Sequence, residues 1–137
     1  MRNILRTAAV AGAGALLTFA TATSAFAEST WFVYSANKAG FGEFTDNGDK
    51  FVACDHAADG YGVYLKMTGQ VYRGPATGNV GVSAATYFSI GNGNCSSNWV
   101  PYDLAEKTPV TLQVCLGKSI NGFVEVSGCG AVTKMTA

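Results

Sequence analysis

Charged side chains are scarce in this sequence, and their scarcity limits the classes of partner. The 137 residues include nine Lys and Arg and nine Asp and Glu, and the formal net charge is zero. No segment gathers its basic residues into a cluster. Nucleic acids are bound largely through Lys and Arg that neutralise phosphates, and anionic lipid surfaces attract similar clusters. The sequence therefore predicts neither nucleic acid nor a lipid surface as a partner.

Histidine is almost absent, which limits the catalytic interpretations. His56 is the single histidine and directly follows Asp55. Four serines are conceivable nucleophiles for it as a general base, and none lies in a Gly-x-Ser-x-Gly setting: Ser83, Ser89, Ser96 and Ser97. The members of a triad also need not be neighbours in sequence, so the pair is no sign of one. A polar turn after a strand explains it better, and we predict that the protein is not an enzyme.

The spacing typical of metal sites is also missing. Zinc sites usually bring their ligands in close pairs such as Cys-x2-Cys, whereas the cysteines here lie far apart. An acidic region lacks the Asp-x-Asp-x-Asp-Gly spacing and the distal Glu of a calcium loop: Asp46, Asp49, Asp55 and Asp59. Turn formation accounts for these aspartates. We therefore predict no metal and no cofactor.

The chain has one long apolar run, and it lies at the start. Arg2 and Arg6 are followed by an apolar stretch over residues 8–20, and then by small residues at Ala25 and Ala27. A basic segment, an apolar segment and an Ala-x-Ala site form the pattern of a secretory signal peptide. The sequence predicts cleavage after Ala27.

This pattern divides the chain into a signal peptide over residues 1–27 and a single domain over residues 28–137. A membrane anchor is the alternative, but the apolar run is shorter than the roughly 20 residues of a spanning helix. We predict a secreted, extracellular protein with no membrane contact after cleavage.

All four cysteines fall in the predicted domain: Cys54, Cys95, Cys115 and Cys129. An even number of cysteines in a small exported domain indicates disulfides. Four cysteines allow three pairings, and we favour Cys115 with Cys129, because they flank a predicted hairpin, which leaves Cys54 with Cys95.

The register of that hairpin can be tested against the favoured pairing. A two-residue turn at Asn121 and Gly122 sets Cys115 opposite Gly128 rather than opposite Cys129. One extra residue corrects the register, and three glycines suit it: Gly117, Gly122 and Gly128.

Short alternating runs broken by Gly, Asn and Asp predict strands over residues 31–35, 41–44, 51–55, 61–67, 80–90, 110–116, 123–126 and 131–134. The one helical candidate, residues 101–107, is too short for more than a turn. Seven or eight short strands favour an all-β fold, a small immunoglobulin-like antiparallel β-sandwich. A small barrel is the alternative. Residues 104–114 are similar to a loop-then-strand crossing of immunoglobulin-like and fibronectin-like domains, which implies that Leu104 is tucked inside.

Aromatic side chains are more numerous than one small core requires. Trp99 and Tyr102 follow Cys95 closely, on a loop that its disulfide would tether. Trp and Tyr are favoured at the centres of interfaces, so we predict a binding surface at Trp99 and Tyr102 on a rigid loop over residues 94–103. The alternative is that Trp99 caps one end of the sandwich.

Several short segments resemble those of small secreted two-disulfide proteins of filamentous actinomycetes: residues 51–55, 59–63, 92–95 and 110–116, with Cys129. The resemblance implies an extracellular location and a β fold, and it carries over no catalytic residues. The sequence thus predicts a secreted, non-catalytic binding protein for an extracellular protein or cell-surface component, an enzyme inhibitor being one form. A structural protein of the cell or spore surface and a small extracellular hydrolase are the alternatives.

Overall fold

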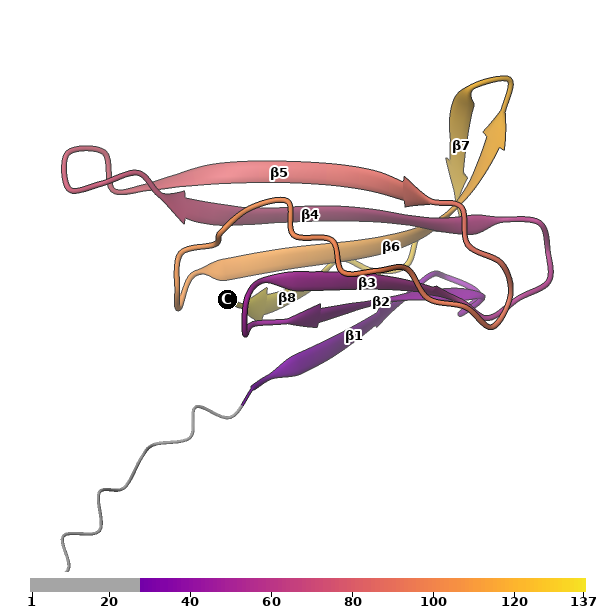
Figure 1. Ribbon diagram of the computed structural model, residues 1–137, viewed down its shortest axis with the longest axis horizontal. Coiled ribbons are helices and arrows are strands. Elements are labelled where there is room, and N and C mark those ends of the chain that lie inside the picture. Colours follow the sequence, from indigo (N-terminus) through magenta and orange to yellow (C-terminus); the bar gives the residue numbers. More distant parts are fainter. Residues whose placement is uncertain (1–27) are drawn as a thin grey trace, which may run out of the picture.

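A computed structural model describes residues 28–137 as two antiparallel sheets packed face to face (Figure 1). The first sheet has the order β1-β2-β3, with β1 at Thr30–Tyr34, β2 at Gly40–Thr45 and β3 at Lys50–Asp55. The second has the order β5-β4-β6-β7, with β8 also paired to β6; its strands are β4 (Gly62–Tyr72), β5 (Asn79–Phe88), β6 (Pro109–Ile120), β7 (Phe123–Ser127) and β8 (Thr133–Thr136). The predicted all-β sandwich is confirmed.

The predicted signal peptide over residues 1–27 lies outside the described residues. In the described part of the chain, no helix has the length and apolarity needed to cross a membrane. The short helical candidate over residues 101–107 is a loop that ends in a turn.

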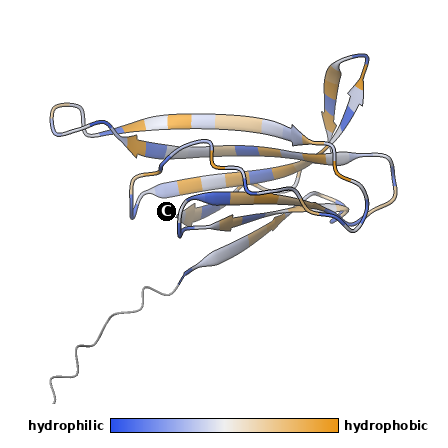
Figure 2. Ribbon diagram, in the orientation of Figure 1, coloured by the Kyte–Doolittle hydropathy of each residue, from blue (hydrophilic) through white to orange (hydrophobic). Residues whose placement is uncertain are grey.

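The core forms because alternate residues of each strand point between the sheets. In β4 the inward residues Val63, Leu65 and Met67 are buried, whereas Lys66 and Thr68 are exposed on the other face. Side chains on successive strand residues point to opposite faces, so this alternation creates one apolar face. Figure 2 shows the resulting alternation of apolar and polar residues along the strands, and the first sheet adds its own inward residues, among them Val33, Phe44, Phe51 and Ala53.

Both predicted disulfides are present, Cys54–Cys95 and Cys115–Cys129. The hairpin of β6 and β7 has the predicted two-residue turn, since Ile120 lies opposite Phe123. Pairing continues unshifted to Ser127, and the extra residue comes next, at Gly128. Gly128 has a φ of +57°, a conformation that glycine adopts without steric cost. It brings Cys129 to Cys115.

Candidate functional site

The predicted catalytic candidates do not come together in the structure. The ring of His56 is exposed and lies edge-on to Phe41, with 4.8 Å between the ring centroids. Asp55 is buried, and its Oδ1 accepts a hydrogen bond from the backbone N–H of Ala57 at 2.9 Å. Among the hydrogen bonds of residues 28–137, none joins His56 to a serine. Asp55 thus closes the turn after β3, and the absence of an enzymatic activity stays a prediction.

The four aspartates each hold a neighbouring backbone group rather than converge. Asp46 accepts a bond from the N–H of Ser29, and Asp59 accepts one from the N–H of Tyr61. Asp49 reaches the loop before β6. Within the described residues, no group of three or more His, Cys, Asp and Glu side chains is placed to hold a metal ion. The carboxylates of Asp55 and Asp59 close local turns, as the turn interpretation expected, whereas those of Asp46 and Asp49 hold distant segments at Ser29 and Leu104.

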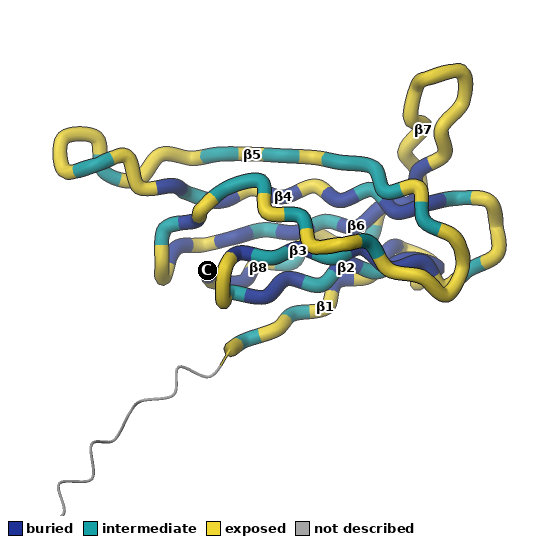
Figure 3. Tube along the Cα trace, in the orientation of Figure 1, coloured by how far each residue is buried: buried dark blue, intermediate teal, exposed yellow. Residues whose placement is uncertain are grey.

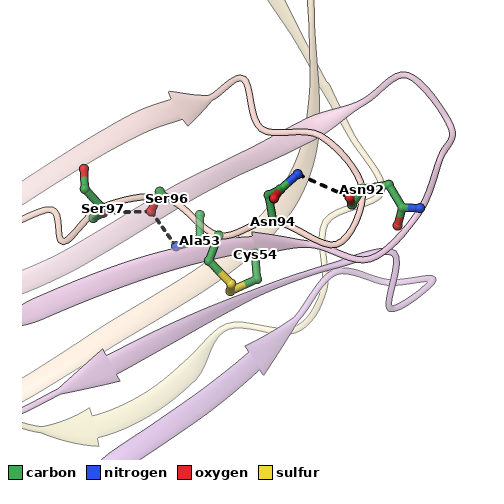
Figure 4. The surroundings of a disulfide bond; sticks show 7 residues. Ala53, Cys54, Asn92, Asn94, Ser96 and Ser97 are labelled. Carbon is green, nitrogen blue, oxygen red and sulfur yellow. Dashed lines mark hydrogen bonds between the residues drawn. A yellow bond between two sulfur atoms is a disulfide. The ribbon is translucent and has the colours of Figure 1, made fainter.

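The predicted binding loop over residues 94–103 runs along the free edge of β3. Cys95 is bonded to Cys54, and the Oγ of Ser96 accepts a hydrogen bond from the N–H of Ala53 at 3.0 Å (Figure 4). Further on, the backbones of Phe51 and Trp99 exchange two hydrogen bonds of 2.8 and 3.0 Å. The loop is therefore tethered, as predicted, because it continues the first sheet as an irregular edge.

Trp99 and Tyr102 are directed back toward the sandwich. The ring of Trp99 is half-buried between Phe51 and Phe88, with centroid distances of 5.7 and 6.1 Å. The hydroxyl of Tyr102 donates to the carbonyl oxygen of Ser83 on β5 at 3.2 Å. Trp99 thus closes the sandwich between the two sheets, in agreement with the alternative interpretation. A role of Trp99 and Tyr102 in binding stays a prediction.

The loop is anchored at its far end by Asp49. The Oδ2 of this buried carboxylate accepts a hydrogen bond from the buried N–H of Leu104 at 2.7 Å. Leu104 itself is buried in the core, as the similarity implied. Burial raises the pKa of the Asp49 carboxyl, the hydrogen bond from Leu104 opposes this, and the nearby carboxylates of Asp103 and Glu106 add to the increase.

Asp49→Ala is expected to lower the free energy of unfolding by about 1–3 kcal/mol, because the buried N–H of Leu104 loses its acceptor. Asp49→Asn keeps an acceptor and suits the φ of +50° at this position, so it should cost less. A raised pKa means that the folded state binds more protons than the unfolded chain at pH values between the ordinary and the raised value. The contribution of Asp49 to stability therefore falls as the pH rises through that window.

Urea unfolding of the three proteins at acidic and neutral pH measures both effects. The free energy of unfolding of Asp49→Asn relative to that of the wild type should rise from acidic to neutral pH. An equal difference at both pH values would contradict the role of burial at Asp49.

A hollow of about 360 Å³ lies at one end of the sandwich. It lies between the loop after β3 and the segment after β5, and Asp55, Tyr61, Tyr87 and Asn92 are among its lining residues. His56 does not line it. Its volume is in the range of small-ligand pockets, but the Asp55 carboxylate already holds its own turn.

An aromatic group lies on the outer face of the first sheet. Phe41 stands between Phe32 and Tyr34, with ring centroids 6.0 and 5.7 Å away, and His56 covers its third side. Phe32 and Tyr34 keep 53% and 45% of their surface exposed. The rings of this group partly cover one another, so the surface they offer to a partner is smaller than their number suggests.

The hairpin of β6 and β7 projects from the sandwich (Figure 1). β4 begins at Gly62, opposite Gly117 of β6, so the residues of β6 after Gly117 pair with β7 alone. Every residue from Lys118 to Ser127 is exposed, which Figure 3 shows as a continuous exposed loop of chain. The projecting part of the hairpin, residues 118–127, therefore buries no side chain in the core, whereas the earlier part of β6 supplies Val110, Leu112 and Val114 to it.

Apolar side chains nevertheless cluster on this hairpin. Phe123 beside the turn is 79% exposed, and the hairpin carries three more exposed apolar side chains: Ile120 opposite Phe123, and Val124 and Val126 on the other face. Single exposed apolar residues are ordinary, but grouped ones mark interaction sites. We call this group, Ile120, Phe123, Val124 and Val126, the apolar tip.

The hairpin is held rigid from both ends. A two-stranded hairpin alone is at best marginally stable in water. Asn121 and Gly122 both have positive φ, as a type I′ turn requires, and this turn matches the twist of the strands. The Cys115–Cys129 disulfide closes the base, and the ammonium of Lys118 lies 5.6 Å from the ring centre of Tyr61.

The sequence interpretation missed the apolar tip as a surface because it treated residues 123–126 as an ordinary return strand. Two signals point to it. The buried alternation of β6 ends where Lys118 appears, and Phe123 and Val124 are apolar on both faces of the hairpin. Comparisons with protein-family models, with curated proteins and with solved structures give no match.

Proposed function

We propose that this protein is a secreted, non-catalytic binding protein that inserts the apolar tip of its β6–β7 hairpin into a concave apolar site on an extracellular protein. The observation that carries the proposal is the exposure of Phe123 on the projecting part of a hairpin, residues 118–127, which contributes nothing to the core. Two disulfides fit an extracellular location, and secretion itself belongs to the proposal.

The shape and charge of the hairpin indicate the kind of partner. A projecting element is convex, so its partner must be concave to cover it. The apolar tip includes no charged residue, and beside it Lys118 lies opposite Glu125, so opposite charges are paired there. An uncharged apolar cleft, such as the substrate cleft of a secreted enzyme, meets both requirements.

Rigidity supports the same proposal. A segment that is ordered before binding loses little conformational entropy when it binds, which raises affinity. The type I′ turn and the disulfide provide this order in the free protein. Inhibition of an extracellular enzyme is therefore the form of binding that the hairpin supports best.

Phe123→Ser is expected to weaken binding to the partner by at least about tenfold, as the loss of a central aromatic contact usually does. Immobilised protein would retain the partner from culture medium, and titration with the purified partner would give the dissociation constant. Val132→Ser is the matched control, because Val132 is 55% exposed on the loop before β8, away from the apolar tip.

Equal affinities of the wild type and Phe123→Ser would contradict the proposal. A loss of affinity in Val132→Ser as large as that in Phe123→Ser would also contradict it, since it would show no preference for the apolar tip. Because both side chains are exposed, neither substitution should change the free energy of unfolding by more than about 0.5 kcal/mol.

A further inference from the structure

β5 presents a long row of unpaired backbone groups. The N–H of Arg73 donates a hydrogen bond to the carbonyl of Gly78, which closes the β4–β5 hairpin. This bond fixes which residues of β5 direct their backbone groups toward β4 and which direct them away. The N–H and C=O groups of alternate residues then point away from β4. These residues are Asn79, Gly81, Ser83, Ala85 and Tyr87. Within residues 28–137, no other strand pairs with this edge, and the one side-chain hydrogen bond to its backbone is that of the Tyr102 hydroxyl to the carbonyl oxygen of Ser83.

The other sheet edges are protected and β5 is not. The segment at Cys95 and Trp99 covers β3, β1 has only five residues, and the edge formed by β7 and β8 is interrupted between them. β5 has ten residues, no charge, no proline and an unbroken register with β4. Natural proteins usually protect an edge by shortness, Lys, Pro or a bulge, because a bare edge pairs with other chains.

We infer that β5 pairs antiparallel with β5 of a second copy of this chain, which joins the two larger sheets into one continuous sheet across a two-fold axis. This inference goes beyond the proposed function, because β5 and the apolar tip lie on different parts of the molecule (Figure 1).

The composition of β5 favours a second copy as the occupant. Like charges opposite one another destabilise a strand pair, and β5 has none to oppose. Two-fold pairing uses the same edge on both copies and closes on itself, so it yields a dimer rather than a fibre. Val82, Ala84 and Phe88 at the margin of the core are only partly buried, and a strand beside β5 would cover them further.

The hydroxyl of Tyr102 is no barrier to this pairing. Its hydrogen bond to Ser83 is exposed and 3.2 Å long, and the carbonyl oxygen that accepts it has a second lone pair. A neighbouring strand can therefore bind the same oxygen or displace the hydroxyl into water.

Sedimentation of the secreted protein over a range of concentrations tests the dimer. The wild type is expected to show a reversible monomer–dimer equilibrium. Ala85→Pro removes an N–H that points away from β4, which an edge strand tolerates, and it should raise the dissociation constant by at least about tenfold. Ser83→Lys brings like charges together on the two paired strands. It should also raise the dissociation constant, and it does so without removing a backbone N–H.

Three results would overturn the inference. In the first, the wild type stays monomeric up to about 1 mM. In the second, it forms a dimer whose dissociation constant Ala85→Pro and Ser83→Lys leave unchanged. In the third, the wild type is a monomer that binds a different protein through β5, and the β5 substitutions abolish that binding. Phe123→Ser separates this inference from the proposed function, because it should leave the dimer unchanged while it weakens binding to the partner. Near-ultraviolet circular dichroism of each variant verifies that the fold is intact.

Discussion

Reduction of both disulfides is expected to unfold this protein at room temperature. The Cys54–Cys95 bond spans a sequence separation of 41 residues, and Cys115–Cys129 spans 14. Restricting the unfolded chain by loops of these lengths stabilises the fold by about 4 and about 3 kcal/mol. The sum is comparable with the whole stability of a small domain, about 5–15 kcal/mol.

The location of the bonds supports the same expectation. Each bond joins a buried cysteine of one sheet, Cys54 or Cys115, to an exposed cysteine on an irregular segment. Cys54–Cys95 holds the loop that places Trp99 over the core. Cys115–Cys129 holds the base of the hairpin and the crossing to β8.

Urea unfolding with and without a reducing agent measures this effect. Cys54→Ser with Cys95→Ser should lower the free energy of unfolding by about 4 kcal/mol, and Cys115→Ser with Cys129→Ser by about 3 kcal/mol. Equal unfolding midpoints for the reduced and the oxidised protein would contradict the role given to the disulfides.

Gly42→Val is expected to destabilise the fold by about 3 kcal/mol, the upper end of the usual cost of overpacking, because an extra side chain does not fit between the sheets. Gly42 is on the inner face of β2. A Cβ atom there would lie 2.9 Å from Leu65, 3.0 Å from Val114 and 3.3 Å from Leu112. These atoms belong to buried side chains of the facing sheet, so they cannot move into solvent.

The matched control is Gly81→Val on β5. A Cβ atom at Gly81 would meet nothing within 4 Å, and the position is exposed. Valine is a better strand residue than glycine, so this substitution should leave stability unchanged or slightly raised. Urea unfolding of both variants gives the comparison, and similar losses at Gly42 and Gly81 would contradict a packing role for Gly42.

Most of the fold could be predicted from local patterns. The alternation in residues 61–67 and 110–116 predicts the inward faces of β4 and β6, because strand side chains have a period of two. The cysteine pairing could be predicted because Cys115 and Cys129 flank one hairpin, in which a glycine can provide the extra residue that brings them opposite each other. The sequence did not indicate which of Gly117, Gly122 and Gly128 provides the extra residue of the hairpin. That position depends on the path of the chain after the hairpin, which is a long-range feature.

The candidate site could be predicted only in part. The sequence showed that the loop after Cys95 would be tethered, but it left open whether Trp99 faces a partner or closes the sandwich, where the structure places it between Phe51 and Phe88. That direction depends on the distance between the two sheets. The projection of the hairpin depends on where β4 begins relative to β6, a long-range register that no local pattern contains.

Hydroxyl-radical footprinting of the protein, free and bound to its partner, tests the proposed binding element most directly. Phe123 is expected to react readily in the free protein and to lose most of its reactivity in the complex. Phe32 and Tyr34 on the outer face of the first sheet should react equally in both states. An unchanged reaction rate at Phe123, together with protection at Phe32, Tyr34 or Tyr102, would show that a different surface binds.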